Sequence, residues 1–295
     1  MSVLLAAVES GSLSGASRKL RLPLPTVSRK VSELESHLKA SLLIRSSKGL
    51  ELTPAGRSYV IAAKAILEQV HEAERAAGGE YVEPKGDLVV TAPTMFGRLH
   101  LLPVVLDFLS AYPDVSVGLM LTDRVTHFLD DQIDVALRIG SLPDSDLIAT
   151  RVGSVRRVLC ASPDYLATRG IPQVPGDLAK HSVISFTGVS ETNVWTFWKG
   201  VEAITVSFRS RFSVTTIEGA IDAGLAGAGL VRTMSYQVAD HIRDGRLTPV
   251  LEACEPNPLP VHLVYGQQSR LPLKLRAFVD FAVPRLRARL EAAAL

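Results

Sequence analysis

The chain has 295 residues, of which 47% are hydrophobic and 21% are charged, and its formal net charge is +2. This length allows two or three domains that each bury a core, and the composition is that of an ordinary globular protein. Two distant cysteines without Cys-x-x-Cys spacing indicate neither a disulfide scaffold nor a zinc knuckle. No apolar run approaches the ~18 residues of a membrane span, and the apolar start is broken by Glu9 without a basic flank. We therefore expect a cytoplasmic protein without a secretory signal or a membrane partner.

Residues 1–58 are basic, whereas the rest of the chain is not. They carry nine Lys and Arg against four Glu, a balance of +5 that leaves −3 for the remainder. A basic module on a mildly acidic body suits a polyanionic partner. Charge alone is equally consistent with a merely basic surface.

The same residues predict three helices followed by a hairpin. Residues 3–8 form a first helix that is about one turn shorter than usual for such a motif, so we expect a truncated start. Ser12 can cap a second helix, and Pro25 suits the first turn of a third. Alternating apolar residues around Ser-Lys-Gly in residues 42–52 predict a two-stranded wing. Together these elements predict a winged helix-turn-helix domain over residues 1–58.

The third helix has one packing face and one polar face. Its apolar stripe consists of Val27, Val31, Leu34 and Leu38. The candidate DNA-contacting residues are Thr26, Ser28, Arg29 and Lys30 on this helix, with Arg45 and Lys48 on the wing. Hydroxyls and guanidinium groups read base edges in a major groove, and basic side chains on a wing contact phosphates. Taken alone, Ser28 and Arg29 would be ordinary solvated residues, but the whole pattern favours DNA recognition.

A long helix and a hinge are predicted over residues 59–86. Thr53 can cap the helix with Pro54 at its first position, and Gly78-Gly79 can end it. Apolar residues recur at spacings of four and three over nearly three heptads: Tyr59, Ala63, Ile66, Val70, Ala73 and Ala77. This seam predicts a homodimer, because two modules read two half-sites. The alternative is an amphipathic helix that packs on its own domain.

Residues 87–295 alternate strand and helix patterns. The expected strands are 88–92, 115–121, 134–139, 157–160, 183–186, 204–214, 229–232 and 261–265. The expected helices are 99–111, 125–132 and 272–290, the last kinked at Pro284. Such alternation predicts parallel sheets with crossover helices. We expect a two-lobed α/β domain like that of periplasmic binding proteins, with lobe one at 87–160 plus 266–295 and lobe two at 161–265.

In such a domain a ligand lies between the lobes, at the carboxyl ends of the strands. The candidate ligand-binding residues are Thr94, Met95, Thr122, Arg138, Ile139, Phe186, Thr187 and Thr215. Thr94 and Met95 precede a helix N-terminus, where free N–H groups attract a carboxylate. Each threonine could instead form a turn or cap, and Arg138 could form a structural ion pair.

Other patterns do not indicate a reaction centre. The order Gly224-x-x-Gly227-x-Gly229 does not fit a nucleotide motif, and the seven histidines lack ligand spacing, so we expect no cofactor and no metal. No nucleophile elbow or paired carboxylates occur, which gives no case for an enzyme. We expect Cys160 to be a buried strand residue rather than a redox sensor, and the segment Trp195-Thr-Phe-Trp to pack the lobe rather than to wall a flat ligand.

The run from about Leu5 to Tyr59 resembles the DNA-binding domain of LysR-type transcriptional regulators. The matching motifs are Val8-Glu-Ser-Gly-Ser12, Gly15-Ala16, Pro25-Thr-Val-Ser-Arg-Lys-Val-Ser-Glu-Leu-Glu35, Leu42-Leu-Ile-Arg45 and Leu52-Thr-Pro-Ala-Gly56. Motifs similar to the family's effector domain are Asp134-Val-Ala-Leu-Arg-Ile-Gly140, Ala161-Ser-Pro-Asp-Tyr-Leu166, Gly170-Ile-Pro172 and Pro175-Gly-Asp-Leu-Ala-Lys-His181. The departures are Gly15 for Ala, Arg21 and Lys39 for Gly, Leu43 for Phe, and Pro23 and Leu24 where Ser and Gln are usual.

The resemblance implies a sequence-specific regulator that binds double-stranded DNA at an interrupted palindrome. It further implies dimers through the linker helix, commonly assembled into tetramers, and a small-molecule effector that carries a carboxylate or an aromatic ring. Two other classes stay open at this point. One is a solute-binding protein whose winged domain has lost its affinity for DNA, and the other is an enzyme on a two-lobed fold.

Overall fold

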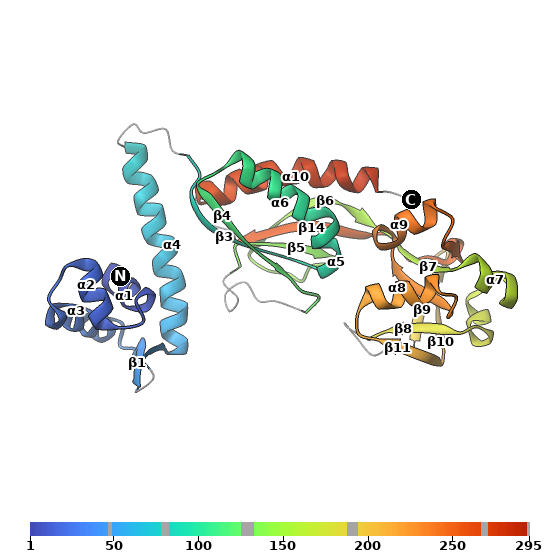
Figure 1. Cartoon of the computed structure of the whole chain (residues 1–295), viewed down its shortest axis with the longest axis horizontal. Coiled ribbons are helices and arrows are strands. Elements are labelled where there is room, and N and C mark those ends of the chain that lie inside the picture. The colour runs from blue at the N-terminus through green and yellow to red at the C-terminus, as the bar shows by residue number, and fades with distance from the viewer. Residues whose placement is uncertain (47–48, 78–82, 125–132, 188–193, 267–270, 294–295) are drawn as a thin grey trace. The chain divides into compact units, whose positions relative to one another are not determined.

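The computed structural model describes residues 1–46, 49–77, 83–124, 133–187, 194–266 and 271–293 (Figure 1). The chain divides into two compact units. The first consists mainly of Met1–Pro84, and the second begins at Lys85. Each unit is described separately below.

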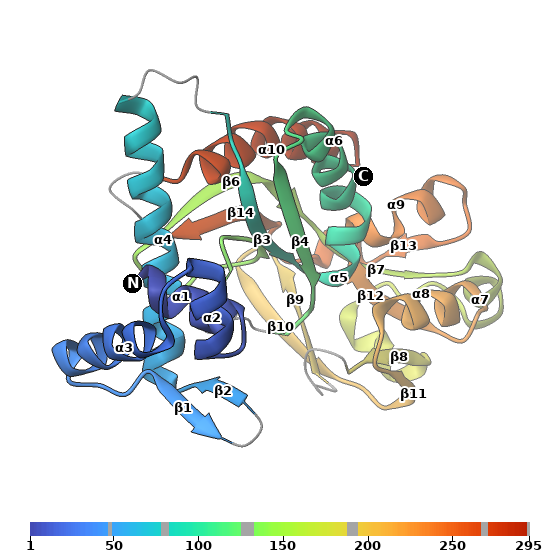
Figure 2. The ribbon, with the colours of Figure 1, turned by 60° about the vertical axis from the view of Figure 1, so that its left-hand side comes forward.

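The first unit is a winged helix-turn-helix domain followed by a long helix, as predicted. Its elements are α1 (Ser2–Glu9), α2 (Leu13–Leu20), α3 (Leu24–Leu38), β1 (Leu43–Ser46), β2 (Gly49–Leu52) and α4 (Pro54–Ala77). Ser12 caps α2, since its Oγ accepts the Gly15 N–H at 3.0 Å. Strands β1 and β2 pair antiparallel to form the wing (Figure 2).

Helices α1, α3 and α4 share the core of this unit, and a threonine caps the start of α4. Val27 and Val31 of α3 are buried, as their stripe predicts, and they pack near α1 residues such as Leu4. Val60 and Ala63 of α4 join the same core. Thr53 caps α4 by accepting the Gly56 N–H at 2.9 Å.

The predicted dimerisation seam of α4 is therefore divided. Tyr59 and Ala63 pack within their own unit, which the seam prediction did not separate from the rest. Ile66 and Val70 are exposed, at 45% and 43%. The side chains of Ala73 and Ala77, and the residues Gly78 and Gly79, lie outside the described part.

The second unit contains two five-stranded sheets. The first sheet has the order β4-β3-β5-β14-β6 and consists of β3 (Gly86–Ala92), β4 (Val115–Leu121), β5 (Val135–Ile139), β6 (Leu147–Val155) and β14 (Leu259–Gly266). The second sheet has the order β11-β8-β12-β7-β13 and consists of β7 (Arg157–Ala161), β8 (Val183–Phe186), β11 (Ser210–Val214), β12 (Leu230–Met234) and β13 (Thr248–Val250). The two sheets define the two lobes.

Helices cover these sheets, and a separate hairpin packs in the second lobe. In lobe one they are α5 (Thr94–Phe96), a π-helix (Gly97–Leu101), α6 (Leu102–Ala111) and α10 (Leu273–Ala292). In lobe two they are α7 (Pro163–Arg169), a 3-10 helix (Pro175–Lys180), α8 (Ile217–Leu225), α9 (Ser235–Arg243) and a short 3-10 turn (Glu252–Cys254). The hairpin comprises β9 (Val194–Lys199) and β10 (Glu202–Ser207). The predicted C-terminal helix is continuous and contains Pro284.

Three sequence predictions for this unit were wrong. The sheets are mixed rather than parallel, because β6, β7, β13 and β14 run antiparallel to their neighbours. The expected strand 204–214 is two strands, β10 and β11, separated at Phe208, which is buried in the core. Strand β7 belongs to the second sheet and β14 to the first, so the lobe limits lie near 156 and 258 rather than 160 and 266.

Some elements were missed or cannot be compared. Strands β6, β9 and β13 were not predicted, because their sequences carry weak alternation. The expected helix 125–132 falls outside the described residues.

One helical stretch of the described chain, Thr94–Ala111, is long and apolar enough by composition to cross a membrane, with a mean hydropathy of 1.2. Its residues Val104, Val105 and Phe108 are buried in lobe one. The Phe108 ring contacts the Phe278 ring of α10, with centroids 5.1 Å apart. The stretch is therefore accounted for as a core helix of an α/β lobe.

Candidate functional site

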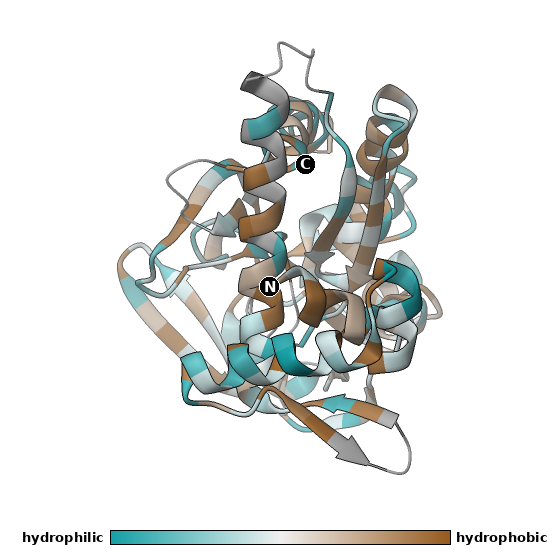
Figure 3. Ribbon diagram, turned by 90° about the vertical axis from the view of Figure 1, so that its left-hand side faces the viewer, coloured by the Kyte–Doolittle hydropathy of each residue, from teal (hydrophilic) through white to brown (hydrophobic). Residues whose placement is uncertain are grey.

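The polar face of α3 presents the residues expected to read DNA. Arg29 and Lys30 are exposed, while Thr26 and Ser28 are half-buried beside the packed stripe. Figure 3 colours the ribbon of the same unit by hydropathy. The Arg29 Nε lies 3.6 Å from the Glu33 Oε1, and both side chains are well exposed. Such an exposed pair holds its partners weakly, because water screens it. The Arg29 guanidinium can therefore exchange this carboxylate for a base or a phosphate.

The entrance of α3 lacks a side-chain cap. Pro23 occupies the N-cap position, so only its carbonyl oxygen serves the helix start, accepting the N–H groups of Thr26 and Val27 at 2.9 and 3.1 Å. Leu24 is 45% exposed at the same entrance. An exposed apolar side chain therefore stands at the position where the resemblance led us to expect a polar one.

Two positions at which the family places glycine have left-handed backbones in this chain. Arg21 ends α2 with φ of 52°, and Lys39 ends α3 with φ of 51°. Side chains with a Cβ carry strain in this conformation, whereas glycine does not. Arg21 and Lys39 therefore carry backbone strain that a glycine at either position would not.

A carboxylate that sequence analysis did not single out fixes the wing to α3. The Glu35 Oε1 accepts the N–H groups of Leu42 and Leu43 at 2.7 and 3.1 Å. Glu35 is the last residue of the Pro25–Glu35 motif that carries the resemblance, and this motif was the only sequence signal at that position. The backbone of Arg45 lies in β1, but its side chain and the whole of Lys48 fall outside the described residues, so their predicted phosphate contacts stay predictions.

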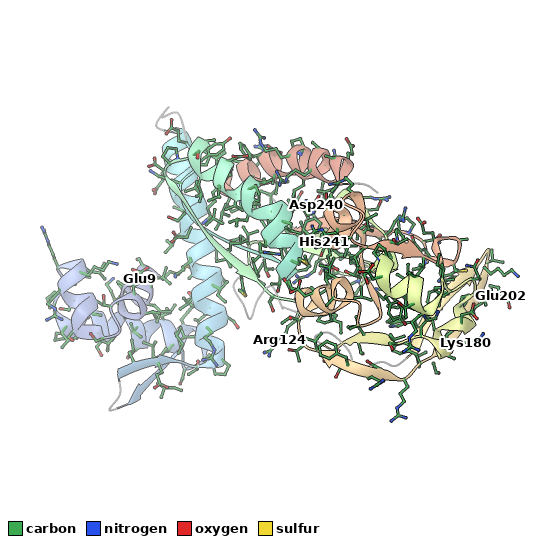
Figure 4. All side chains as sticks on the ribbon, turned by 45° about the vertical axis from the view of Figure 1, so that its right-hand side comes forward. Glu9, Arg124, Lys180, Glu202, Asp240 and His241 are labelled. Atoms are coloured by element: carbon green, nitrogen blue, oxygen red, sulfur yellow. The ribbon has the colours of Figure 1, made fainter. Side chains whose placement is uncertain are left out.

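In the second unit, the candidate ligand-binding residues lie at strand ends, but several already have local partners. The Thr94 N–H donates to Asp123 Oδ1 at 3.0 Å, so this amide is not free as the sequence suggested. The Thr122 Oγ1 accepts the N–H of Arg124, which Figure 4 labels, at 3.2 Å. The first contact joins the segments that follow β3 and β4, and the second closes a turn at the end of β4.

The second-lobe candidates show a similar pattern. The Thr187 Oγ1 donates to the Val214 carbonyl oxygen at 3.3 Å. Thr216 caps α8 by accepting the Gly219 N–H at 3.3 Å, while Thr215 beside it is exposed. Phe186 is half-buried against the lobe-two core. Among these residues, Thr215 and Thr216 are therefore the exposed ones.

Met95 lies where the two lobes meet. It is 7% exposed and packs in the core of lobe two with Val158, Cys160 and Ile184. The first lobe's α5 edge therefore abuts the second lobe directly. Arg138 and Ile139 at the end of β5 are half-buried, and burial lowers the pKa of Arg138.

A buried histidine, missed by sequence analysis, lies at this lobe junction. The His100 ring centroid lies 4.9 Å from that of Phe96 in lobe one and 5.5 Å from that of Tyr236 in lobe two. Neither ring nitrogen has a hydrogen-bond partner among the described residues. Burial, with the Arg289 charge as a second cause, lowers the pKa of His100 to about 4. The imidazole is therefore neutral at neutral pH.

The burial of Cys160 and of the Trp195–Trp198 segment bears on the two remaining candidates from the sequence. Cys160 is fully buried, and burial raises the pKa of its thiol to about 12, which fits the predicted inert strand residue. Trp195 and Phe197 pack in the lobe-two core, as predicted, whereas Trp198 is exposed. In the described part of the chain, no group of three or more His, Cys, Asp and Glu side chains could hold a metal ion.

Fold and sites together define a winged helix-turn-helix protein with a two-lobed ligand-binding domain. Comparison with known families agrees: residues 1–57 match the bacterial regulatory helix-turn-helix protein family of the lysR type, and residues 82–287 match the LysR substrate binding domain. The chain belongs to the LysR family of transcriptional regulators.

Its relatives are named as transcriptional regulators, and the match spans most of their length. It is 33% identical over 285 residues to an HTH-type transcriptional repressor of Pseudomonas aeruginosa, covering 96% of this chain and 90% of the relative. It is 33% identical to the HTH-type transcriptional regulator CrgA of Neisseria meningitidis, covering 97% and 96%. The solved structure of CrgA is similar with a TM-score of 0.62, at 31% identity and 97% coverage of each chain. The full-length structure of the Vibrio cholerae virulence activator AphB is similar with a TM-score of 0.62, at 27% identity, covering 96% and 97%.

Proposed function

We propose that this LysR-type regulator reads its operator with the polar face of α3. The observation that carries the proposal is that α3 has two different sides. Arg29 and Lys30 are exposed on one side, and Val27 and Val31 are buried on the other. Half-buried hydroxyls at Thr26 and Ser28 complete the face. Arg45 and Lys48 on the wing are proposed to contact phosphates, because a wing beside such a helix meets the DNA backbone. The protein then acts in the cytoplasm, on an interrupted palindrome in double-stranded DNA.

Fluorescence anisotropy with DNA from upstream of the protein's own gene tests this interface. Arg29→Ala should lower the ratio of specific to nonspecific affinity by about 5- to 100-fold, the discrimination of one good arginine–base contact. Arg211→Ala, which removes an exposed cation from the effector domain, is the matched control. Sequence discrimination that survives Arg29→Ala would refute the assignment of the reading face. Absence of any salt-sensitive DNA binding would instead favour a solute-binding protein without DNA affinity.

The effector is proposed to bind where the strand ends of the two lobes meet. Supporting this position are the accessible Thr215 on lobe two and the half-buried Arg138 at the end of β5. Thr94, Met95, Thr122, Ile139, Phe186 and Thr187 complete the proposed surroundings. A small anion suits the site, because Arg138 supplies a cation in a partly desolvated position. Binding there would change how the lobes pack and so alter the DNA-binding state.

A thermal-shift screen of small carboxylates and aromatic acids tests the effector site. A ligand that stabilises the protein should lose most of its effect in Arg138→Ala and in Thr122→Val. A stabilisation that is equal in both variants and in the unmodified chain would place the effector elsewhere.

Dimerisation is proposed to use the exposed half of the α4 seam. Ile66 and Val70 are one helical turn apart and expose apolar surface, while Tyr59 and Ala63 are already packed. Light scattering should show that Ile66→Glu with Val70→Glu shifts the full chain towards monomers. Lys64→Glu, at an exposed position of the same helix, is the matched control. A dimer that persists unchanged in the double variant would exclude this face of α4 as an interface. A tetramer that dissociates only to dimers would show that this face joins two dimers instead of forming the dimer.

A further inference from the structure

Two arginines lie diagonally beside each other on the lobe-two sheet. In the antiparallel pair of β12 and β7, Arg232 lies opposite Leu159, and Arg157 precedes Leu159 by two residues. Since side chains alternate along a strand, Arg157 and Arg232 point to the same face as Leu159. That face packs with the β9–β10 hairpin, whose Glu202 is labelled in Figure 4, because Leu159 shares a core with Phe197. Both arginines are half-buried.

Aromatic rings form a wall beside these guanidinium groups. The Arg232 guanidinium carbon lies 5.5 Å from the Trp195 ring centroid and 5.1 Å from that of Phe197. The Arg232 Nη2 donates to the Thr196 carbonyl oxygen at 2.8 Å. Trp195 is held in turn by Phe208, with ring centroids 4.3 Å apart. One of the five N–H groups of Arg232 is therefore accounted for by this carbonyl, and its position is fixed.

The positive charge at this place has no carboxylate partner among the described residues. Arg156, the next residue along, pairs with Glu252 and Glu255 at 3.4 and 3.0 Å. No such ion pair is found for Arg157 or Arg232 in the part of the chain that the structure describes. Burial, followed by the neighbouring charge of Arg157, lowers the pKa of Arg232 to about 10, and burial lowers that of Arg157. Two like charges held together in partly desolvated surroundings favour binding of an anion.

We propose that Arg157 and Arg232 form a second ligand site, which binds the carboxylate of a small organic anion whose flat apolar body rests against Trp195. Two planar guanidinium groups suit a carboxylate, and the indole face suits a planar ring. The site is distinct from the proposed effector position. Val158, Cys160 and Val231 alternate with these residues and turn the other face of the sheet towards α8. A ligand here would fix the hairpin to the sheet of lobe two.

The chain supplies its own reporter for this site. Both of its tryptophans, Trp195 and Trp198, lie in β9. Trp198→Phe leaves Trp195 as the single emitter, so the emission of the full-length protein reports on the arginine pair. Benzoate is the probe, because it combines one carboxylate with one flat ring. Acetate, inorganic phosphate and benzyl alcohol separate the contributions of carboxylate, anionic charge and ring.

Benzoate should change the Trp195 emission saturably. Arg157→Gln should raise the midpoint concentration by about 10-fold or more, the range expected for a lost charged hydrogen bond. Arg209→Gln, at an exposed position of the same lobe, removes the same charge and should leave the midpoint unchanged. Because Arg232 packs on the rings, circular dichroism must first show that Arg232→Gln is folded. Arg157→Lys keeps the charge without the planar fork, and should weaken benzoate binding while leaving that packing intact.

Three results with benzoate or its neutral analogue would overturn the proposal. They are the absence of a saturable response to benzoate, an equal midpoint in Arg157→Gln and the unmodified chain, and equal binding of benzyl alcohol. Binding of phosphate in preference to benzoate would also refute the organic carboxylate as the ligand class. A response that disappears in Arg138→Ala but persists in Arg157→Gln would assign benzoate to the effector position, and so separates failure of this site from failure of the other.

Discussion

Replacing Lys39 by glycine should stabilise the DNA-binding unit. Lys39 ends α3 with φ of 51° and ψ of 34°. A left-handed conformation costs an L-residue about 1–2 kcal/mol, and glycine is free of that penalty. Glycine also gains about 0.5–1 kcal/mol of conformational freedom in the unfolded chain, which opposes the gain. The net expectation is about 0.5–1 kcal/mol of stabilisation.

The two units can be followed separately in one experiment. Both tryptophans lie in β9, so tryptophan fluorescence follows the second unit only, whereas far-UV circular dichroism follows both. Lys39→Gly should raise the midpoint of the transition that dichroism alone detects by about 2–8 °C for a unit of this size. The fluorescence midpoint should not move.

A matched variant separates backbone strain from the side chain. Lys39→Ala removes the long side chain but keeps the Cβ, so the strain at φ of 51° persists and no comparable gain is expected. If Lys39→Ala stabilised as much as Lys39→Gly, the cause would be the lysine side chain. If Lys39→Gly left the dichroism transition unchanged or lowered it, the reasoning from left-handed strain would be refuted.

Three further predictions follow from burial and close approach. Gly56→Ala should destabilise the first unit by about 1–3 kcal/mol or more in denaturant unfolding, because an added Cβ would lie 2.0 Å from the Leu42 carbonyl oxygen. The control is Gly176→Ala, which should be near neutral because an added Cβ there would meet no atom within 4 Å and φ is ordinary. Burial lowers the pKa of His100 from 6.5 to about 4, so the unfolded chain binds the extra proton, and stability present above pH 6.5 should be lost as the pH falls towards 4. His100→Leu should flatten this pH dependence of the melting midpoint that fluorescence detects. An unchanged slope would contradict the assignment. Iodoacetamide followed by mass spectrometry should label Cys254 before Cys160 in the native protein, because burial raises the pKa of Cys160 to about 12, and early labelling of Cys160 would contradict its burial.

Local patterns made the first unit predictable from sequence. The Ser12 cap, the stripe that includes Val27 and Val31, and the two wing strands are each decided within a few residues, and the structure reproduces them. The division of the α4 seam was not predictable in this way. Burial of Ala63 depends on a core contributed by α1 and β1, which no periodicity within α4 contains.

In the second unit, the positions of many strands were predictable but their pairing was not. Its strands were found where apolar runs are strong, as in β4 and β8, but their directions and sheet membership depend on pairing between distant residues. The contacts around the candidate ligand-binding residues also depend on distant segments. The Thr94 amide meets Asp123 from the following strand end, and His100 meets Tyr236 from the other lobe. The pairing of Arg157 with Arg232 likewise depends on the β7–β12 register, which neither segment reveals alone.

The position of β14 in the first sheet has a consequence for synthesis of the protein. This strand pairs on one side with β5 and on the other with β6, yet it is made only after the whole of lobe two. On the ribosome, the second sheet is therefore available complete while the first still lacks the strand that joins its halves. Until β14 emerges, β5 and β6 present unpaired edges, which are sites for association with other chains. A nascent chain paused before Leu259 should be the species that chaperones bind, and slower translation there should increase aggregation rather than relieve it.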